Sequence, residues 1–232
     1  MTAVDLVTIR LVWAEDVALR PSPHFLRGAI GGCFPDNPLF HQHDGERLLY
    51  RYPLIQYRWD QSGPWLLGLG AGAQFLKETE WIGMQLNLGG CAVTVRDAVC
   101  AFRFHEIRAT GRLCRYRFAA PWLPLSQDNY ARYQRLSRIE RCLELDRLAV
   151  AGVLLGLRGF GVEFSERLYA AFEMKSARPC EYKGVQVMGF TGCLMANVDL
   201  PDGFAIGRAV SHGYGWITSP QKEPSSDDVR DA

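Results

Sequence analysis

The sequence lacks the marks of an exported, membrane-spanning or zinc-ribbon protein. Its first residues show no basic start followed by an apolar run, and the longest apolar stretch, residues 148–157, is far too short to span a bilayer. The seven cysteines form no C-x-x-C pair and leave an odd number, which favours free thiols over a zinc site or a complete disulfide framework. We therefore expect a soluble cytoplasmic protein.

The sequence also has a low net charge and few lysines. A net charge of +1 and a pI near 7.6 argue against binding nucleic acid by bulk basicity, for which a domain pI above about 9 is usual. The charge is unevenly placed, because residues 96–147 hold 11 Arg, no Lys and 6 acidic residues, and so carry +5. Of the 26 basic residues 22 are Arg, whose guanidinium suits bidentate phosphate contacts.

The first half of the chain alternates between strand and helix patterns. We expect a helix over residues 22–32, with Ser22 as N-cap, Pro23 at its first position and a glycine pair at its end. A second helix is expected over 71–86, and strands over 6–14, 48–59, 64–70 and 91–104. The order is β-α-β-β-α-β, the ferredoxin-like pattern that RNA-recognition domains also use.

The second half begins near the Pro-rich stretch 115–125. Leu136, Ile139 and Leu143 are spaced as the apolar face of one long amphipathic helix over 126–161. Two strands, 166–181 and 184–200, follow around a turn at Lys183. Two halves of similar size and pattern suggest tandem related domains.

The stretch PDNPLFHQHDG, residues 35–45, places His41 and His43 one residue apart between turn-forming clusters. On an extended chain such a pair points the same way, about 6 to 7 Å apart, and could straddle a phosphodiester as general base and general acid. In RNA the 2′-hydroxyl already supplies a nucleophile, so no metal is needed. A zinc site, for which further ligands are not evident nearby, and two loop histidines without a role are the alternatives.

A glycine-rich segment, GFAIGRAVSHGYG, spans residues 203–215. Glycines let backbone N–H groups approach phosphate oxygens closely, and a basic side chain adds charge. The segment matches neither a P-loop nor a dinucleotide-binding fingerprint, so a tight turn that holds a C-terminal strand is the alternative interpretation.

Two blocks, residues 26–73 and 182–217, resemble the CRISPR repeat-processing endoribonucleases. They are most similar to the "Cas-six" branch, in which an H-x-H is followed by Tyr-Arg-Tyr-Pro-Leu-Ile-Gln-Tyr, here residues 50–57. The resemblance implies an α+β fold of tandem ferredoxin-like (RRM-like) domains, at 1–118 and 119–219, with a disordered tail at 220–232. It also implies metal-independent cleavage of precursor CRISPR RNA within repeats, without a cofactor, leaving a 2′,3′-cyclic phosphate and a 5′-hydroxyl.

By position, the family's catalytic histidines fall on His41 and His43. Its RNA-binding loop falls on 207–215, where the usual Arg or Lys of the family is replaced by His212. We expect RNA contacts from Arg51, Arg58, Gly207, Arg208, Ser211, His212, Gly213 and Gly215. The expected partners are precursor and mature guide RNA and no membrane, with an effector complex and a homodimer left open. The alternative function is a repeat-RNA-binding subunit that does not cleave.

Overall fold

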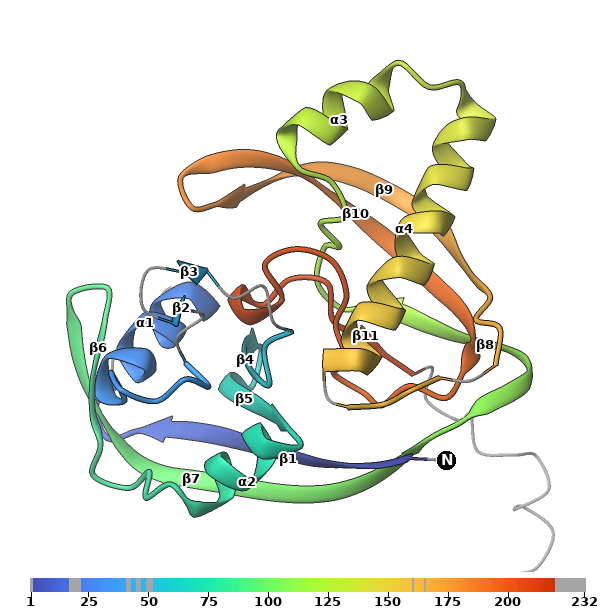
Figure 1. The fold of residues 1–232 in the computed structure, drawn as a ribbon. Coiled ribbons are helices and arrows are strands. Elements are labelled where there is room, and N and C mark those ends of the chain that lie inside the picture. The colour runs from blue at the N-terminus through green and yellow to red at the C-terminus, as the bar shows by residue number, and fades with distance from the viewer. Residues whose placement is uncertain are drawn as a thin grey trace, which may run out of the picture.

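The computed structural model describes residues 2–16, 22–40, 43–44, 47–48, 52–159, 161–164 and 166–219. Two antiparallel sheets form its framework (Figure 1). The first sheet has the order β4-β5-β1-β7-β6 and carries two helices. Its elements are β1 (Thr2–Trp13), α1 (Pro23–Cys33), β4 (Ile55–Asp60), β5 (Gly63–Leu69), α2 (Ala71–Glu78), β6 (Gln85–Leu88) and β7 (Cys91–Ile107).

The second sheet has the order β11-β8-β10-β9. Its elements are β8 (Ala109–Phe118), α3 (Gln127–Gln134), α4 (Arg138–Gly159), β9 (Ala170–Tyr182), β10 (Val185–Val198), the 3₁₀ helix η1 (Val210–His212) and β11 (Ile217–Thr218). Two further strands, β2 (His43–Asp44) and β3 (Arg47–Leu48), pair only with each other.

Both sheets have ferredoxin-like strand order, which confirms the expected fold class. In the first, β6 is an addition beside β7, and the remaining order β7-β1-β5-β4 is that of a β-α-β-β-α-β unit. In the second, β11-β8-β10-β9 repeats this order, but η1 and the glycine-rich segment stand where the second helix would be. No helix among the described residues is long and apolar enough to cross a membrane.

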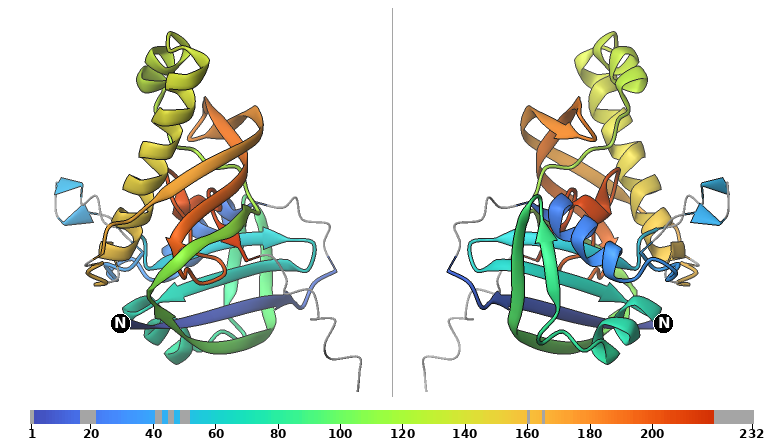
Figure 2. Two further views of the ribbon diagram at one scale, coloured as in Figure 1. Left: turned by 90° about the vertical axis from the view of Figure 1, so that its right-hand side faces the viewer. Right: turned by 90° about the vertical axis from the view of Figure 1, so that its left-hand side faces the viewer.

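One curved ribbon connects the two sheets, because only Arg108 separates β7 from β8 (Figure 2). The boundary expected after residue 118 is therefore one strand too late, since β8 pairs with β10 and β11 of the second sheet. Leu6 and Leu67 of the first sheet share an apolar cluster with Phe204 and Ile206 of the glycine-rich segment. The two sheets are thus joined both by a one-residue connection of the chain and by a shared apolar core.

The expected long helix over 126–161 is wrong, because the chain forms two helices with a break at 135–137. Ser137 and Glu140 make a capping box at the break: the Ser137 N–H donates to Glu140 at 2.8 Å, and the Glu140 N–H donates to the Ser137 hydroxyl at 3.3 Å. The expected apolar face is wrong as well, since Ile139 is 74% and Leu143 62% exposed. The buried face of α4 lies instead on Leu145, Ala149, Val153 and Leu157.

The other boundaries differ less. Ser22 caps α1 as expected by accepting from the Phe25 N–H at 3.3 Å, although the helix runs through its glycine pair to Cys33. The helix expected over 71–86 ends at Glu78, because Thr79 is extended and its hydroxyl donates to the Phe75 carbonyl at 2.7 Å. Within the expected strand 48–59, β4 begins only at Ile55. The expected tail, 220–232, lies outside the described residues.

Candidate functional site

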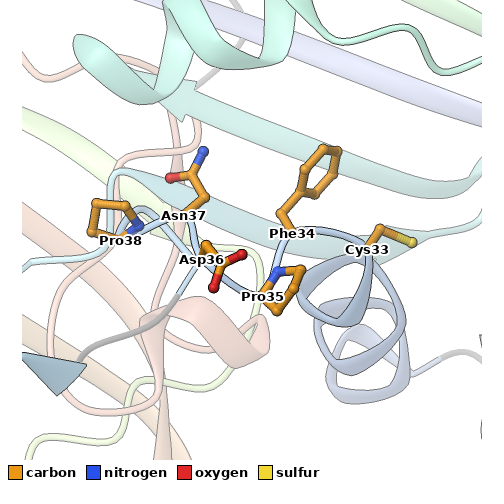
Figure 3. A pocket seen from close by; sticks show the side chains of 6 residues that line it. All are labelled: Cys33, Phe34, Pro35, Asp36, Asn37 and Pro38. Carbon is orange, nitrogen blue, oxygen red and sulfur yellow. The ribbon is translucent and has the colours of Figure 1, made fainter. Parts of the chain in front are cut away.

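The chain that leads to the paired histidines is anchored immediately before them. Phe40 is buried, stacks on Phe34 with ring centroids 5.0 Å apart, and meets the Phe75 ring of α2 edge-on at 5.1 Å. Asn37 tightens this turn by accepting from the Leu39 N–H at 2.9 Å. Residues 33–38 line a shallow hollow of about 490 Å³ at the end of α1 (Figure 3). The H-x-H therefore starts from a fixed point on the first domain.

The two histidines themselves are only partly described. His41 lies outside the described residues, as does Arg51. His43 opens β2, where it pairs in register with Leu48 of β3. The backbone of His43 is extended, and the extended pair expected of His41 and His43 stays a prediction because residues 41 and 42 lie outside the described residues.

The glycines of the glycine-rich segment are required by backbone conformation and by packing. Gly207, Gly213 and Gly215 have φ values of 94°, 87° and 66°, which other residues rarely adopt. A Cβ at Gly207 would lie 2.7 Å from the Trp122 ring nitrogen, and one at Gly213 would lie 2.7 Å from Cγ of Pro23 in α1. The segment is thus pressed against both α1 and the second domain.

Arg208 and Ser211 are two polar side chains that the segment leaves accessible. Arg208 is exposed and makes no ion pair within the part of the chain that the structure describes, while its backbone N–H donates to the Leu123 carbonyl at 2.9 Å. Ser211 is half-buried in η1. Both therefore lie where the sequence-based expectation of an RNA contact can be met.

Arg58 does not lie at the surface, so its expected phosphate contact is corrected by the structure. Its side chain is fully buried and donates to the carbonyls of Val210 at 3.0 Å and Gly203 at 3.3 Å, and to the Gln56 side chain. Burial lowers the pKa of this guanidinium to about 9. Arg58 thus fastens the first domain to the glycine-rich segment instead of reaching solvent.

Tyr52, from the Tyr-Arg-Tyr-Pro motif, forms a second link between the first domain and the glycine-rich segment. Its hydroxyl donates to the Ala205 carbonyl at 2.8 Å, and its side chain is packed so closely on α4 that a Cβ at Gly159 would lie 2.1 Å from Cβ of Tyr52 and 2.8 Å from the ring. Burial raises the pKa of this hydroxyl to about 12. The motif next to the H-x-H therefore positions the second domain.

His212 is nearly buried and meets a partner from the other domain. Its Nδ1 lies 3.1 Å from Nδ1 of His24 in α1, and the two rings stack with centroids 5.1 Å apart. Burial, then the positive charges of Arg27, His24 and Lys183, lower the pKa of His212 to about 3. The ring is neutral at neutral pH, so it does not replace the charge of the family's usual Arg or Lys.

Sequence reasoning missed His24, Arg27 and Lys183. His24 and His212 are 188 residues apart in the chain, so no local pattern connects them. Among the described residues no three His, Cys, Asp or Glu side chains gather in a way that could hold a metal ion.

Two ferredoxin-like domains in tandem, the second completed by a glycine-rich segment in place of a helix, define the class of fold to which this chain belongs. Models of the Cas6b N-terminal and C-terminal domains match residues 4–99 and 108–220. The chain belongs to the Cas6b family.

Individual relatives are distant in sequence but close in fold. A crystal structure of Cas6b aligns with a TM-score of 0.81 at 23% identity, over 94% of this chain and 100% of that one. A crystal structure described as the CRISPR RNA processing endoribonuclease Cas6b aligns with a TM-score of 0.72 at 22% identity over the same shares. An uncharacterized protein of Methanocaldococcus jannaschii is 28% identical over 133 residues, which is 57% of this chain and 90% of that one.

Proposed function

We propose that this protein is an endoribonuclease that cleaves precursor CRISPR RNA within its repeats, without a metal ion. The observation that carries the proposal is the extended backbone of His43, the second histidine of the H-x-H, in a strand that begins three residues after the anchored Phe40. Membership of the Cas6b family supports it, as does the similarity to a solved structure described as a CRISPR RNA processing endoribonuclease. The protein would act in the cytoplasm, on precursor RNA, and its product would be the guide RNA.

The chemistry needs only the RNA and two imidazoles. One of His41 and His43 removes the proton of a 2′-hydroxyl, whose oxygen attacks the adjacent phosphorus. The P–O5′ bond breaks, and the other histidine, in its protonated form, gives its proton to the leaving 5′-oxygen. The products are a 2′,3′-cyclic phosphate and a 5′-hydroxyl, and the two histidines exchange protonation states. Imidazole suits both roles because its ordinary pKa lies near neutrality.

The RNA strand is held by groups around the glycine-rich segment. Arg208 supplies a free guanidinium, and the Ser211 hydroxyl and the backbone around Gly207, Gly213 and Gly215 supply further polar contacts. We assign Arg51, in the same motif as Tyr52, to the RNA as well. His212 contributes by supporting His24, since its own ring is neutral and nearly buried.

Cleavage of end-labelled repeat RNA in EDTA tests the proposal. We expect one cut in the intact RNA and none in a copy whose 2′-hydroxyl next to the cut is replaced by hydrogen. The double variant His41→Ala/His43→Ala should bind but not cut, whereas the control His105→Ala, on β7 beside Asp199, should cut normally. Binding without cutting by the unaltered protein would instead support a non-cleaving repeat-RNA-binding subunit, and cutting that EDTA abolishes would support a metal-dependent hydrolase.

A further inference from the structure

Three elements that are distant in sequence bring basic and aromatic side chains together beside the glycine-rich segment. α1 supplies His24 and Arg27, the turn between β9 and β10 supplies Tyr182 and Lys183, and η1 supplies His212. Figure 1 shows η1 next to α1, and the views of Figure 2 agree. We call these five residues the α1–η1 junction.

Ring contacts order the junction around His212. On one side its ring stacks on His24 at an interplanar angle of 13°, and on the other Tyr182 meets it edge-on with centroids 5.1 Å apart. Lys183 then lies with Nζ 5.7 Å from the centre of the Tyr182 ring. Arg27 is three residues after His24, which places both on one side of the helix.

The junction is held in place by backbone packing, not by its own charges. Gly213 lies against Pro23 so closely that a Cβ there would be 2.7 Å from Cγ of that proline. Arg58 binds the Val210 carbonyl at the start of η1. Lys183 and Gly184 close the β9–β10 turn with φ values of 53° and 75°. The basic side chains are therefore presented from a rigid base.

The junction has positive charge with no compensating carboxylate among the groups that act on its centre. The charges that perturb His212 come from Arg27, His24 and Lys183, all of them positive. The nearest acid in sequence, Glu181, precedes Tyr182 on a strand, so its side chain points to the opposite face of the sheet. His24 and Lys183 are exposed, and Arg27 is half-exposed.

The tautomer in which His212 donates leaves a hydrogen-bond donor at the edge of the junction. Two Nδ1 atoms 3.1 Å apart require that one carries the proton and the other accepts it. When His212 donates, Nδ1 of His24 accepts, so His24, the more exposed ring, carries its own proton on Nε2 and can donate it outward.

The exposed Lys183, the half-exposed Arg27, an imidazole donor and an aromatic ring, with no acid among the described groups that act on His212, suit a phosphate group of a single-stranded nucleic acid. We propose that His24, Arg27 and Lys183 form a phosphate subsite for the RNA strand, with His212 as the residue that positions His24. This inference rests on the proposed function and extends it, because the subsite draws residues from both domains.

Binding measured as a function of salt concentration tests the subsite with the full chain. The probe is a fluorescent repeat RNA with hydrogen in place of the 2′-hydroxyl at the cut. Each phosphate contact that is removed should reduce the slope of log K against log salt by about 0.7. We expect this reduction for Arg27→Ala and for Lys183→Ala, with a several-fold weaker affinity near 0.15 M salt. Lys77→Ala, on the exposed last turn of α2, is the matched control and should keep the original slope.

The outcomes separate this inference from the proposed function. Unchanged slopes for Arg27→Ala and Lys183→Ala, in variants whose thermal unfolding matches that of the unaltered protein, would overturn the subsite. Reduced slopes together with a failure to cut intact RNA would keep the subsite and overturn the nuclease. If the unaltered protein binds no RNA, both are overturned.

Discussion

The two domains share one strand order but differ in what stands at the second helix position. The first domain has α2 there, whereas the second has the glycine-rich segment with η1. A helix satisfies its backbone groups internally and presents only side chains, while an irregular segment must be held by its surroundings. Here Arg58 and Tyr52 of the first domain bind its carbonyls. The difference therefore makes the first domain the support on which the second domain's glycine-rich segment is built.

The largest expected effect is on the cleavage rate of variants that lack one of the two histidines, His41 or His43, of the first domain. His41→Ala and His43→Ala should each lower the single-turnover cleavage rate by about 10²- to 10⁴-fold and leave RNA affinity unchanged. The pH–rate profile tells the two roles apart. In a variant without the general base, the cleavage rate no longer rises with pH at the acidic end. In a variant without the general acid, the cleavage rate no longer falls at the basic end. A variant that weakens binding as much as cleavage would assign its histidine to binding instead.

The next effect contrasts one arginine from each domain. Arg58→Met should lower the free energy of unfolding by about 3 kcal/mol, because it leaves buried carbonyls without their donor. Arg208→Met should leave stability unchanged and reduce the salt dependence of RNA binding by one phosphate contact. Denaturant unfolding and binding titrations on both variants measure this. Equal stability of the two variants would contradict the fastening role of Arg58.

A smaller difference is expected between two glycines with positive φ. Gly213→Ala should cost about 2 to 3 kcal/mol of stability, because it adds a steric clash with Pro23 to the strain of a φ of 87°. Gly63→Ala, in the β4–β5 turn of the first domain, has a φ of 99° and no atom within 4 Å of the new Cβ, so only about 1 to 2 kcal/mol is expected. The midpoints of chemical denaturation show whether Gly213→Ala lowers the stability more than Gly63→Ala does.

The smallest effect is a pH dependence at the contact between the domains. The pKa of His212 is about 3 in the folded state and ordinarily near 6.5, so the unfolded chain binds more protons between these values. His212 thus costs no stability above pH 6.5, and it destabilises the folded state progressively as the pH falls toward 3. His24, Arg27 and Lys183, which face it, strengthen this trend. Thermal unfolding from pH 7 to pH 4 should show a shallower decline for His212→Asn than for the unaltered protein.

Local sequence patterns were enough to predict the fold but not the contacts between the first domain and the glycine-rich segment. The cap at Ser22, the strand order and the extended backbone of His43 depend on neighbouring residues, which can be read directly from the sequence. The break before α4 was hidden by continuous apolar spacing, although the S-x-x-E pattern of Ser137 and Glu140 marked it. The burial of Arg58 depends on carbonyls about 150 residues away in the chain, which no local pattern reports.

The single residue between β7 and β8 limits how the molecule can move. A connection through Arg108 alone, fixed where its carbonyl accepts from the Asp199 N–H at 2.9 Å, offers little hinge between two sheets that also share an apolar cluster. We therefore expect the domains to unfold in one cooperative step and to keep a constant orientation relative to each other. In an encounter with RNA it would be the nucleic acid that bends to fit, which favours repeats whose strand is unpaired and pliable near the cut.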